Sequence, residues 1–208
     1  MIKRVAEAYH VTPMEGVLSH QMNRFLIDGD KVIMNKPMVD QRVEKCTFEA
    51  NDVWCIDIVM STGEGVAREG ELRTTVFKRD LEKMYMLKLK ASRYLLQQIN
   101  KKAPVFPFTL RAFDDERQAR MGISEMVSHG MVDPYPVLFE KDHEIVAQFK
   151  TTVFVLPKQT RAAFTPALPD YVKSEYTCED ELVKAVLATP LTTEDKKPEE
   201  EKKPEEKK

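Results

Sequence analysis

The chain has 208 residues, of which 42% are hydrophobic and 32% are charged, and its formal net charge at pH 7 is −2. This length suits one domain of ordinary size, and the absence of any apolar run near 20 residues excludes a membrane-spanning helix. Cys46, Cys55 and Cys178 form no CxxC pair, which predicts reduced thiols in a cytosolic or nuclear compartment.

Positive charge is concentrated in the middle of the chain. Residues 78–120 hold 11 Lys and Arg against 5 Asp and Glu, so this stretch carries +6 and the rest carries −8. A basic block in a nearly neutral chain is typical of a surface that contacts phosphates. Two solvated helix faces have the same composition, so charge alone leaves both interpretations open.

The first half of the chain predicts a helix followed by strands. Residues 2–10, IKRVAEAYH, have the spacing of the end of an amphipathic helix. Residues 53–60 are apolar on both faces, which predicts a buried strand in which Asp57 needs a partner. The turn residues 61–65 and the β-rich residues 72–78 predict that this strand returns in a long hairpin.

Two helices are predicted next. The first runs from Asp80 to about Asn100, with Met84 at the start of its apolar stripe. The second runs from about Leu110 to His129, and Gly130 stops it. The acidic run at residues 114–116 suits the start of this second helix, because carboxylates stabilise the positive end of the helix dipole.

The last third of the chain predicts two strands, a short helix and a tail. Strands are expected at residues 135–140 and 144–156, around a turn at 141–143, and a helix is expected at about 179–187. Residues 194–208 contain seven acids and six lysines with nothing to bury, which predicts a disordered charged tail.

Several motifs resemble a known family. Those at residues 16–21 (GVLSHQ), 53–65 (VWCIDIVMSTGEG) and 146–157 (VAQFKTTVFVLP) resemble type 2 methionine aminopeptidases. Together with LRTTVFKRD and FPFTLRAFDDE, they resemble the proliferation-associated, or ErbB receptor-binding, protein family, whose members are non-peptidase relatives of those enzymes.

The resemblance runs from about residue 2 to about residue 187 and implies an α+β fold. The expected architecture is the C-terminal half of the aminopeptidase-like, or pita-bread, fold: a largely antiparallel sheet with helices and a two-helix insertion at about residues 80–130. On this basis residues 1–193 correspond to the C-terminal portion of a protein nearly twice as long, followed by the charged tail at 194–208.

The same resemblance implies a degenerate metal site. The ligand histidine of the enzymes falls on His20, a ligand glutamate on Asp57, the second active-site histidine on Asp28, and the glutamate that bridges two divalent ions on Lys150. An ammonium has no lone pair for a metal and repels a nearby dication. We therefore predict no catalytic residue, no metal and no cofactor. We also predict that Lys150 pairs with Asp57 across neighbouring strands as a buried lysine, with His20 close by.

The function implied by the resemblance is that of a non-catalytic, monomeric factor associated with ribosomes and RNA. Its partners would be the large ribosomal subunit and rRNA, with further protein partners in growth signalling. It would act on ribosome biogenesis, translation and cell growth, in the cytoplasm and in the nucleus and nucleolus. The candidate RNA-binding residues are Lys88, Lys90, Arg93, Lys101, Lys102, Arg111, Arg117 and Arg120.

Two alternatives remain from the sequence. One is an active metallo-aminopeptidase that removes N-terminal methionine, which requires a metal site that tolerates Lys150. The other is a signalling or transcription adaptor without RNA binding. A peptidase assay with cobalt or manganese tests the first, and salt-dependent ribosome binding separates the second from the preferred function.

Overall fold

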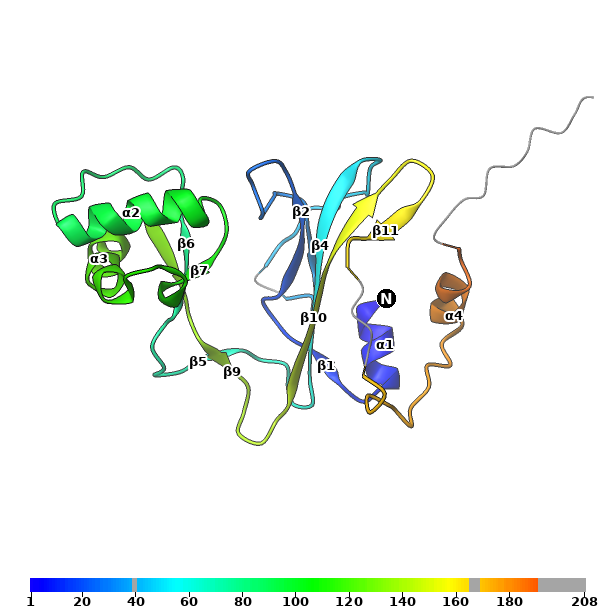
Figure 1. The fold of residues 1–208 in the computed structure, drawn as a ribbon. Coiled ribbons are helices and arrows are strands. Elements are labelled where there is room, and N and C mark those ends of the chain that lie inside the picture. The colour runs from blue at the N-terminus through cyan, green and yellow to red at the C-terminus, as the bar shows by residue number, and fades with distance from the viewer. Residues whose placement is uncertain (39–40, 165–168, 191–208) are drawn as a thin grey trace, which may run out of the picture.

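The computed structural model describes residues 1–38, 41–164 and 169–190, which form a central antiparallel sheet with a helical body on one side (Figure 1). The sheet has the order β11-β10-β4-β2-β3, and β1 pairs with β4 off this path. Its strands are β1 (Thr12–Pro13), β2 (Leu18–Met22), β3 (Val32–Met34), β4 (Asp52–Ser61), β10 (Val146–Val155) and β11 (Thr160–Ala162).

The centre of this sheet is the pair β4 and β10, which lie antiparallel over ten residues each. β4 carries apolar side chains on both faces, and its Trp54 is fully buried. The buried strand predicted at residues 53–60 is therefore confirmed. The hairpin predicted with residues 72–78 is wrong, because β10, about 90 residues downstream, occupies the edge of β4 where the return strand would pair.

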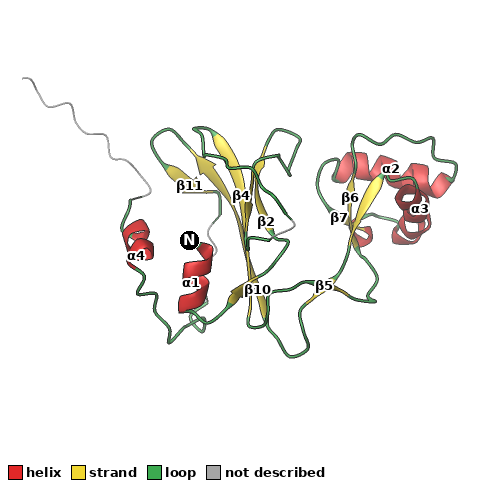
Figure 2. Cartoon of the chain, turned by 180° about the vertical axis from the view of Figure 1, so that it is seen from behind, coloured by secondary structure: helices red, strands yellow, loops and turns green. Residues whose placement is uncertain are grey.

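Residues 72–135 form the insertion body, which has a three-stranded sheet of its own (Figure 2). Its elements are β6 (Val76–Arg79), α2 (Lys90–Lys102), β7 (Phe108–Thr109), the 3-10 helix η1 (Leu110–Ala112), α3 (Glu116–Ser128) and β8 (Val132–Tyr135). Its core gathers apolar residues from all six, among them the fully buried Leu95, Ile99 and Met126. A two-stranded ribbon of β5 (Arg68–Glu69) and β9 (Leu138–Phe139) leads from this body to the central sheet.

The first helix of the insertion body starts ten residues later than the sequence predicts. Residues 80–89 are not helical, and Met84, predicted to lie on the apolar stripe, is 93% exposed. The cause is Glu125 of α3, whose carboxylate accepts hydrogen bonds from the backbone N–H groups of Lys88 and Leu89 at 2.8 and 3.1 Å. This distant carboxylate supplies the N-terminal cap of α2 and sets its start.

The second predicted helix is split into η1 and α3. α3 begins directly after Asp115, whose side chain accepts a hydrogen bond from the Gln118 N–H at 2.9 Å and so caps the helix. Gly130 lies two residues past the last residue of α3, with φ +64, which is the left-handed conformation that favours glycine after a helix. Both the acidic start and the glycine stop of this helix are thus confirmed.

The remaining expectations are mostly confirmed. Helices α1 (Ile2–Ala8) and α4 (Glu181–Leu187) are present on the side of the sheet away from the insertion body, and Arg4 donates to Asp180 at 2.7 Å (Figure 1). The strand predicted at 135–140 is wrong as one element, because β8 and β9 are separate and Pro136 lies between them. The charged tail lies outside the described residues. None of the described helices is long and apolar enough to cross a membrane.

Candidate functional site

Strands β4 and β10 bring Asp57 and Lys150 together. The two residues are cross-strand partners, so their side chains leave the same face of the sheet. Lys150 Nζ donates to Asp57 Oδ2 at 2.9 Å. The predicted ion pair is confirmed, but the prediction of a buried lysine is wrong, because the Lys150 side chain is 53% exposed.

Both oxygens of the Asp57 carboxylate are engaged by donors. Oδ1 accepts from Gln148 Nε2 at 2.7 Å, and Oδ2 accepts from Lys150. Within the described ranges, no three His, Cys, Asp or Glu side chains gather where they would hold a metal ion. Because an ammonium stands beside the carboxylate, the residues present do not fit the divalent ions of the related enzymes.

Neighbouring charge and burial shift the pKa values of two side chains on this face. Partial burial disfavours the Lys150 ammonium, but the hydrogen bond and charge of Asp57 outweigh burial and raise the pKa of Lys150. Burial raises the pKa of the Cys55 thiol, which leaves β4 on the same face two residues from Asp57. The site therefore holds a closed ion pair beside a protonated thiol, and neither is an activated nucleophile or a general base.

The other two predicted site residues are not part of this pair. His20 on β2 is the cross-strand partner of Cys55, which lies two residues before Asp57 on β4. The buried Nδ1 atom of His20 has no hydrogen-bond partner within the described chain. Asp28, in the loop after β2, forms an ion pair with Lys78 of β6 instead. Because Lys78 belongs to the insertion body, this ion pair holds Asp28 against that body and not beside Asp57.

Sequence reasoning missed two residues that position Asp57. Gln148 lies two residues before Lys150 on β10, so both side chains leave the same face of the strand. This alternation is the sequence signal from which Gln148 could have been predicted to lie near Asp57. Ser19 holds the backbone of Asp57, with its Oγ accepting from the Asp57 N–H at 2.9 Å. No sequence pattern indicates that contact, since 38 residues separate the two.

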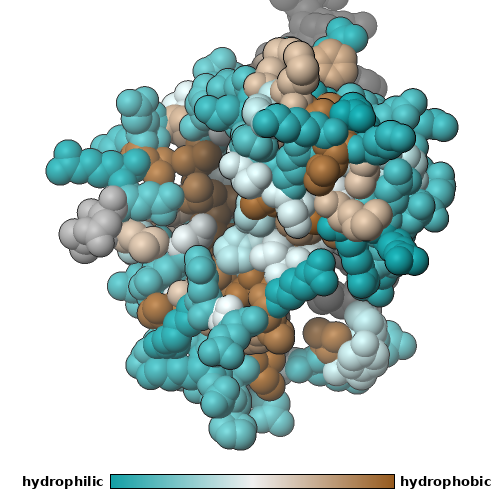
Figure 3. Space-filling model, turned by 90° about the vertical axis from the view of Figure 1, so that its left-hand side faces the viewer, coloured by the Kyte–Doolittle hydropathy of each residue, from teal (hydrophilic) through white to brown (hydrophobic). Residues whose placement is uncertain are grey.

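The candidate RNA-binding residues fall into two groups in the structure. Five of them make no side-chain hydrogen bond or ion pair with any described residue, and their side chains are exposed: Lys88, Lys90, Lys101, Arg111 and Arg117. Lys90 and Lys101 are eleven residues apart on α2, about three turns, and thus share one face. Figure 3 shows this end of the molecule, where hydrophilic side chains cover most of the outer surface.

The other three candidates are engaged inside the insertion body. Lys102 donates to Asp114 at 2.8 Å, and Arg120 donates to Glu116 at 2.5 Å. Arg93 donates to the carbonyls of Leu87 and Lys88 at 2.9 and 2.8 Å, so it braces the segment before α2. These three residues have structural partners that the sequence did not indicate.

Known proteins are similar to this chain over nearly its whole length. No family model matches the chain. It is 44% identical to proliferation-associated protein A of Dictyostelium discoideum over 92% of this chain and 50% of that protein. It is 43% identical to ERBB-3 binding protein 1 of Solanum tuberosum over 94% of this chain and 50% of that protein. The chain belongs to the proliferation-associated protein family.

The fold is shared with solved relatives. The structure of a thermophilic Arx1 matches 91% of this chain and 51% of its own chain, with a TM-score of 0.81 and 31% identity. Type 2 methionine aminopeptidases are similar at lower identity, for example 32% over 72% of this chain. The predicted family and aminopeptidase-like α+β fold are confirmed, and this member spans about half the length of the curated relatives it matches.

Proposed function

We propose that this member of the proliferation-associated protein family is a non-catalytic factor that binds ribosomes through its insertion body. The observation that supports the proposal is the set of exposed, unpaired cations on that body, including Lys88, Lys90 and Lys101. Cations that are not neutralised within the protein are available to phosphates, and phosphate contact releases counterions from the nucleic acid. Such a surface recognises the shape and backbone of rRNA rather than its bases.

A peptidase function is disfavoured by Lys150. The glutamate expected at this position in the related enzymes is replaced by an ammonium that is hydrogen-bonded to Asp57. Because that contact occupies a carboxylate needed for metal and adds positive charge, we propose that the chain does not act as an aminopeptidase.

The cellular role follows from the same proposal. Binding to the large subunit would act on ribosome biogenesis, translation and growth, in the cytoplasm and in the nucleus and nucleolus. The potato relative is named ERBB-3 binding protein 1, which supports protein partners in growth signalling as an additional part of the proposal. A signalling or transcription adaptor without RNA binding predicts no ribosome binding at any salt concentration.

Co-sedimentation with purified large subunits tests the proposal. The variant Lys88→Glu/Lys90→Glu/Lys101→Glu should lose binding at moderate salt, because three cations become anions on a surface that faces phosphates. The matched control is Arg42→Glu/Arg161→Glu/Lys173→Glu, which changes the charge equally at exposed positions away from the insertion body. Equal binding of both variants would overturn the proposal.

Truncation after Thr193 tests the tail. Residues 194–208 carry seven acids and six lysines, so their removal should change binding much less than the triple charge reversal. Loss of binding on truncation, with retention in the triple variant, would assign the contact to the tail instead.

A further inference from the structure

The segment that leads into α2 exposes a row of apolar side chains. Residues 81–89, LEKMYMLKL, run alongside α2 in the opposite direction before that helix begins (Figure 1). Met84 and Met86 are 93% and 88% exposed, and Leu81 and Leu89 at the two ends of the segment are half-exposed. Single exposed apolar side chains are common, but four within nine residues form a patch of the kind that marks an interaction surface.

The segment is anchored by the residues that lie between and after the two methionines. Tyr85 stacks on His129 with the ring centroids 3.5 Å apart, and Leu87 is buried in the core of the insertion body. Glu125 then caps the start of α2. Because these anchors alternate with the methionines, the structure holds the two exposed thioether side chains on the outer side of the segment.

A groove of about 410 Å³ lies between this segment and α2. Tyr85, Met86 and Leu87 line it from the segment, and Arg93 and Leu96 line it from α2 together with two amide side chains. The lining is mainly apolar and contains no carboxylate. Methionine is unbranched and flexible, so it adapts its shape to an apolar partner. The groove therefore offers an adaptable apolar wall on which side chains of another molecule can be buried.

Cations surround the groove. Lys83, Lys88 and Lys90 are exposed, and their side chains make no hydrogen bond or ion pair with the described residues. Residues 81–93 carry four cations and one acid, Glu82. A rim of this charge is complementary to a partner that carries carboxylates beside its apolar residues.

Two occupants from the protein itself are disfavoured. Residues 194–208 contain only Glu, Asp, Lys and Pro, so this tail has too little apolar surface to fill the groove. A second copy of the chain would bring two cationic rims together, and like charges across an interface oppose association.

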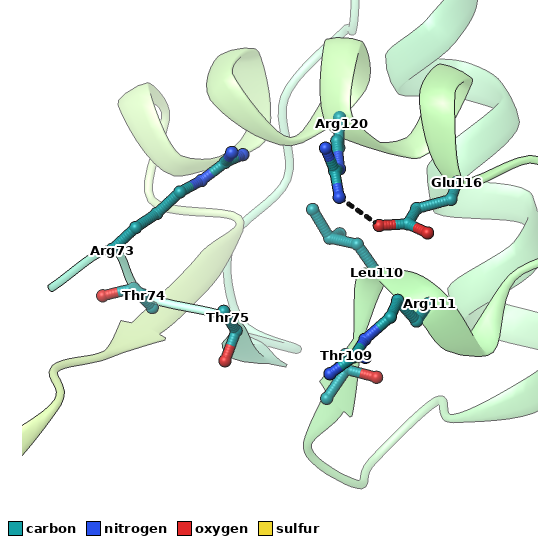
Figure 4. A pocket seen from close by; sticks show the side chains of 8 residues that line it. All are labelled: Arg73, Thr74, Thr75, Thr109, Leu110, Arg111, Glu116 and Arg120. Carbon is teal, nitrogen blue, oxygen red and sulfur yellow. Dashed lines mark hydrogen bonds and ion pairs between the residues drawn. The ribbon is translucent and has the colours of Figure 1, made fainter.

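The other cavity of the insertion body, lined in part by Arg73, Arg111 and Arg120, has no comparable organisation (Figure 4). The guanidinium groups of Arg73 and Arg111 lie at opposite ends of it, and Arg120 is bonded to Glu116. Its charges do not converge on one ligand, whereas the groove beside α2 combines an apolar wall with a rim of one sign.

We propose that the groove beside α2 docks an amphipathic helix of a partner protein. The apolar stripe of that helix lies over Met84, Met86 and Leu96, and its acidic residues face Lys83 and the lysines at the start of α2. Helices that bind in grooves present apolar residues at positions i, i+3, i+4 and i+7, which suits a groove that follows a helix. The inference goes beyond ribosome binding, because it depends on the methionines and not on charge alone.

NMR of the full chain with ¹³C in the methionine methyl groups tests the docking surface. The probe is a synthetic peptide of about 18 residues, or about five helical turns, with Leu at helical spacing and Glu and Ala elsewhere. The methyl signals of Met84 and Met86 should shift and saturate as peptide is added. The signal of Met121, which is exposed on α3, should stay in place.

Two control peptides isolate the apolar stripe and the charge. A peptide of the same composition in scrambled order has no apolar stripe, and it should bind at least several-fold more weakly. A peptide with Lys in place of every Glu keeps the stripe but meets the cationic rim with like charge, so it should produce no shift. Equal binding of the scrambled peptide would overturn the inference.

A pair of variants separates docking from ribosome binding. Met84→Ser/Met86→Ser should weaken binding of the acidic peptide about tenfold or more, which corresponds to about 1.4 kcal/mol. Its co-sedimentation with large ribosomal subunits should not change, because no charge is altered. Met121→Ser removes an exposed methionine elsewhere on the insertion body and should bind the peptide like the unchanged protein. Both variants should keep the unfolding temperature, since all three methionines are exposed.

The outcomes distinguish this inference from the proposed function. If the peptide binds as expected but the unchanged protein does not bind ribosomes, the proposed function alone is wrong. If Met84→Ser/Met86→Ser loses ribosome binding as strongly as peptide binding, the methionines belong to the ribosome contact and a separate docking surface is wrong. If phosphatidylglycerol vesicles shift the Met84 and Met86 signals and the peptide does not, the surface binds a membrane and the helix assignment is overturned.

Discussion

The insertion body and the central sheet differ in what they bury. The insertion body closes its apolar core, where Leu95 and Ile99 are fully buried, and leaves cations such as Lys101 open. The central sheet pairs its charges, as Asp57 and Lys150 show, and leaves apolar side chains exposed on β10, including Phe149 at 43%. The two regions therefore treat these charges differently: Lys101 stays open to other molecules, whereas Asp57 and Lys150 satisfy each other.

The largest expected effect is on the packing of the insertion body. A Cβ at Gly122 of α3 would lie 2.6 Å from the carbonyl oxygen of Ala91 and 2.9 Å from Ser92 Cα on α2. Both are backbone atoms, so Gly122→Ala must move α2 and should lower the free energy of unfolding by about 2 kcal/mol, as overpacking does. Urea unfolding measures this effect. Met121→Ala, at the exposed neighbouring position on α3, should change it by less than about 0.5 kcal/mol.

A pH-dependent effect comes next, at the edge of the central sheet. Glu140 accepts hydrogen bonds from the N–H groups of Gly65 at 2.7 Å and Lys141 at 2.9 Å, and from Ser61 Oγ at 3.0 Å. Burial disfavours its charge, but these bonds outweigh burial and lower the pKa of Glu140 to about 2.

The direction of the pH effect follows from that shift. An unfolded glutamate has a pKa of about 4.3. The charged Glu140 therefore stabilises the native state fully above about pH 5, and this contribution is lost as the pH falls toward 2. Glu140→Gln should make the free energy of unfolding less dependent on pH in that window. The exposed Glu69→Gln should keep the steeper dependence, and an equally steep curve for Glu140→Gln would contradict the assignment.

Reversing the charge at Lys150 probes the closed pair. Lys150→Glu restores the residue type of the enzymes but places two carboxylates opposite each other, which should cost about 1 kcal/mol of unfolding free energy or less at neutral pH. Peptidase activity with cobalt or manganese should stay absent. The variant Lys150→Met removes the ion pair without adding a second carboxylate, so it separates the loss of the pair from the repulsion. Measurable peptidase activity in Lys150→Glu would refute the non-catalytic assignment.

The sequence predicted those parts of the fold and site that depend on local patterns and family motifs. Strand alternation and the aminopeptidase motifs placed Asp57 opposite Lys150, and the acidic start and Gly130 placed the ends of α3. The start of α2 depends on Glu125, which is about 36 residues away in sequence, so no local pattern reveals it. The false hairpin has the same cause, since the strand that pairs with β4 lies far downstream.

Tertiary partners also decide which cations stay open, and two adjacent lysines show this most directly. The Lys101 side chain makes no hydrogen bond or ion pair within the described chain, whereas Lys102 donates to Asp114 at 2.8 Å and to the Ala112 carbonyl at 3.2 Å. The hydrogen bond and charge of Lys102 lower the pKa of Asp114. The sequence makes both lysines candidates for RNA binding, but in the structure Lys102 is engaged by Asp114 and Lys101 is not hydrogen-bonded.

The smallest expected effects distinguish these two lysines. Lys101→Gln should weaken ribosome binding and leave stability unchanged, because it removes an open cation. Lys102→Gln should leave binding nearly unchanged and reduce stability only slightly, since exposed ion pairs contribute little. A double-mutant cycle with Asp114→Asn measures the coupling and should find a larger value for Lys102, which is hydrogen-bonded to Asp114, than for Lys101. If the two single variants weaken ribosome binding equally, intramolecular pairing does not determine which cations bind, and the contrast between the two regions fails at that point.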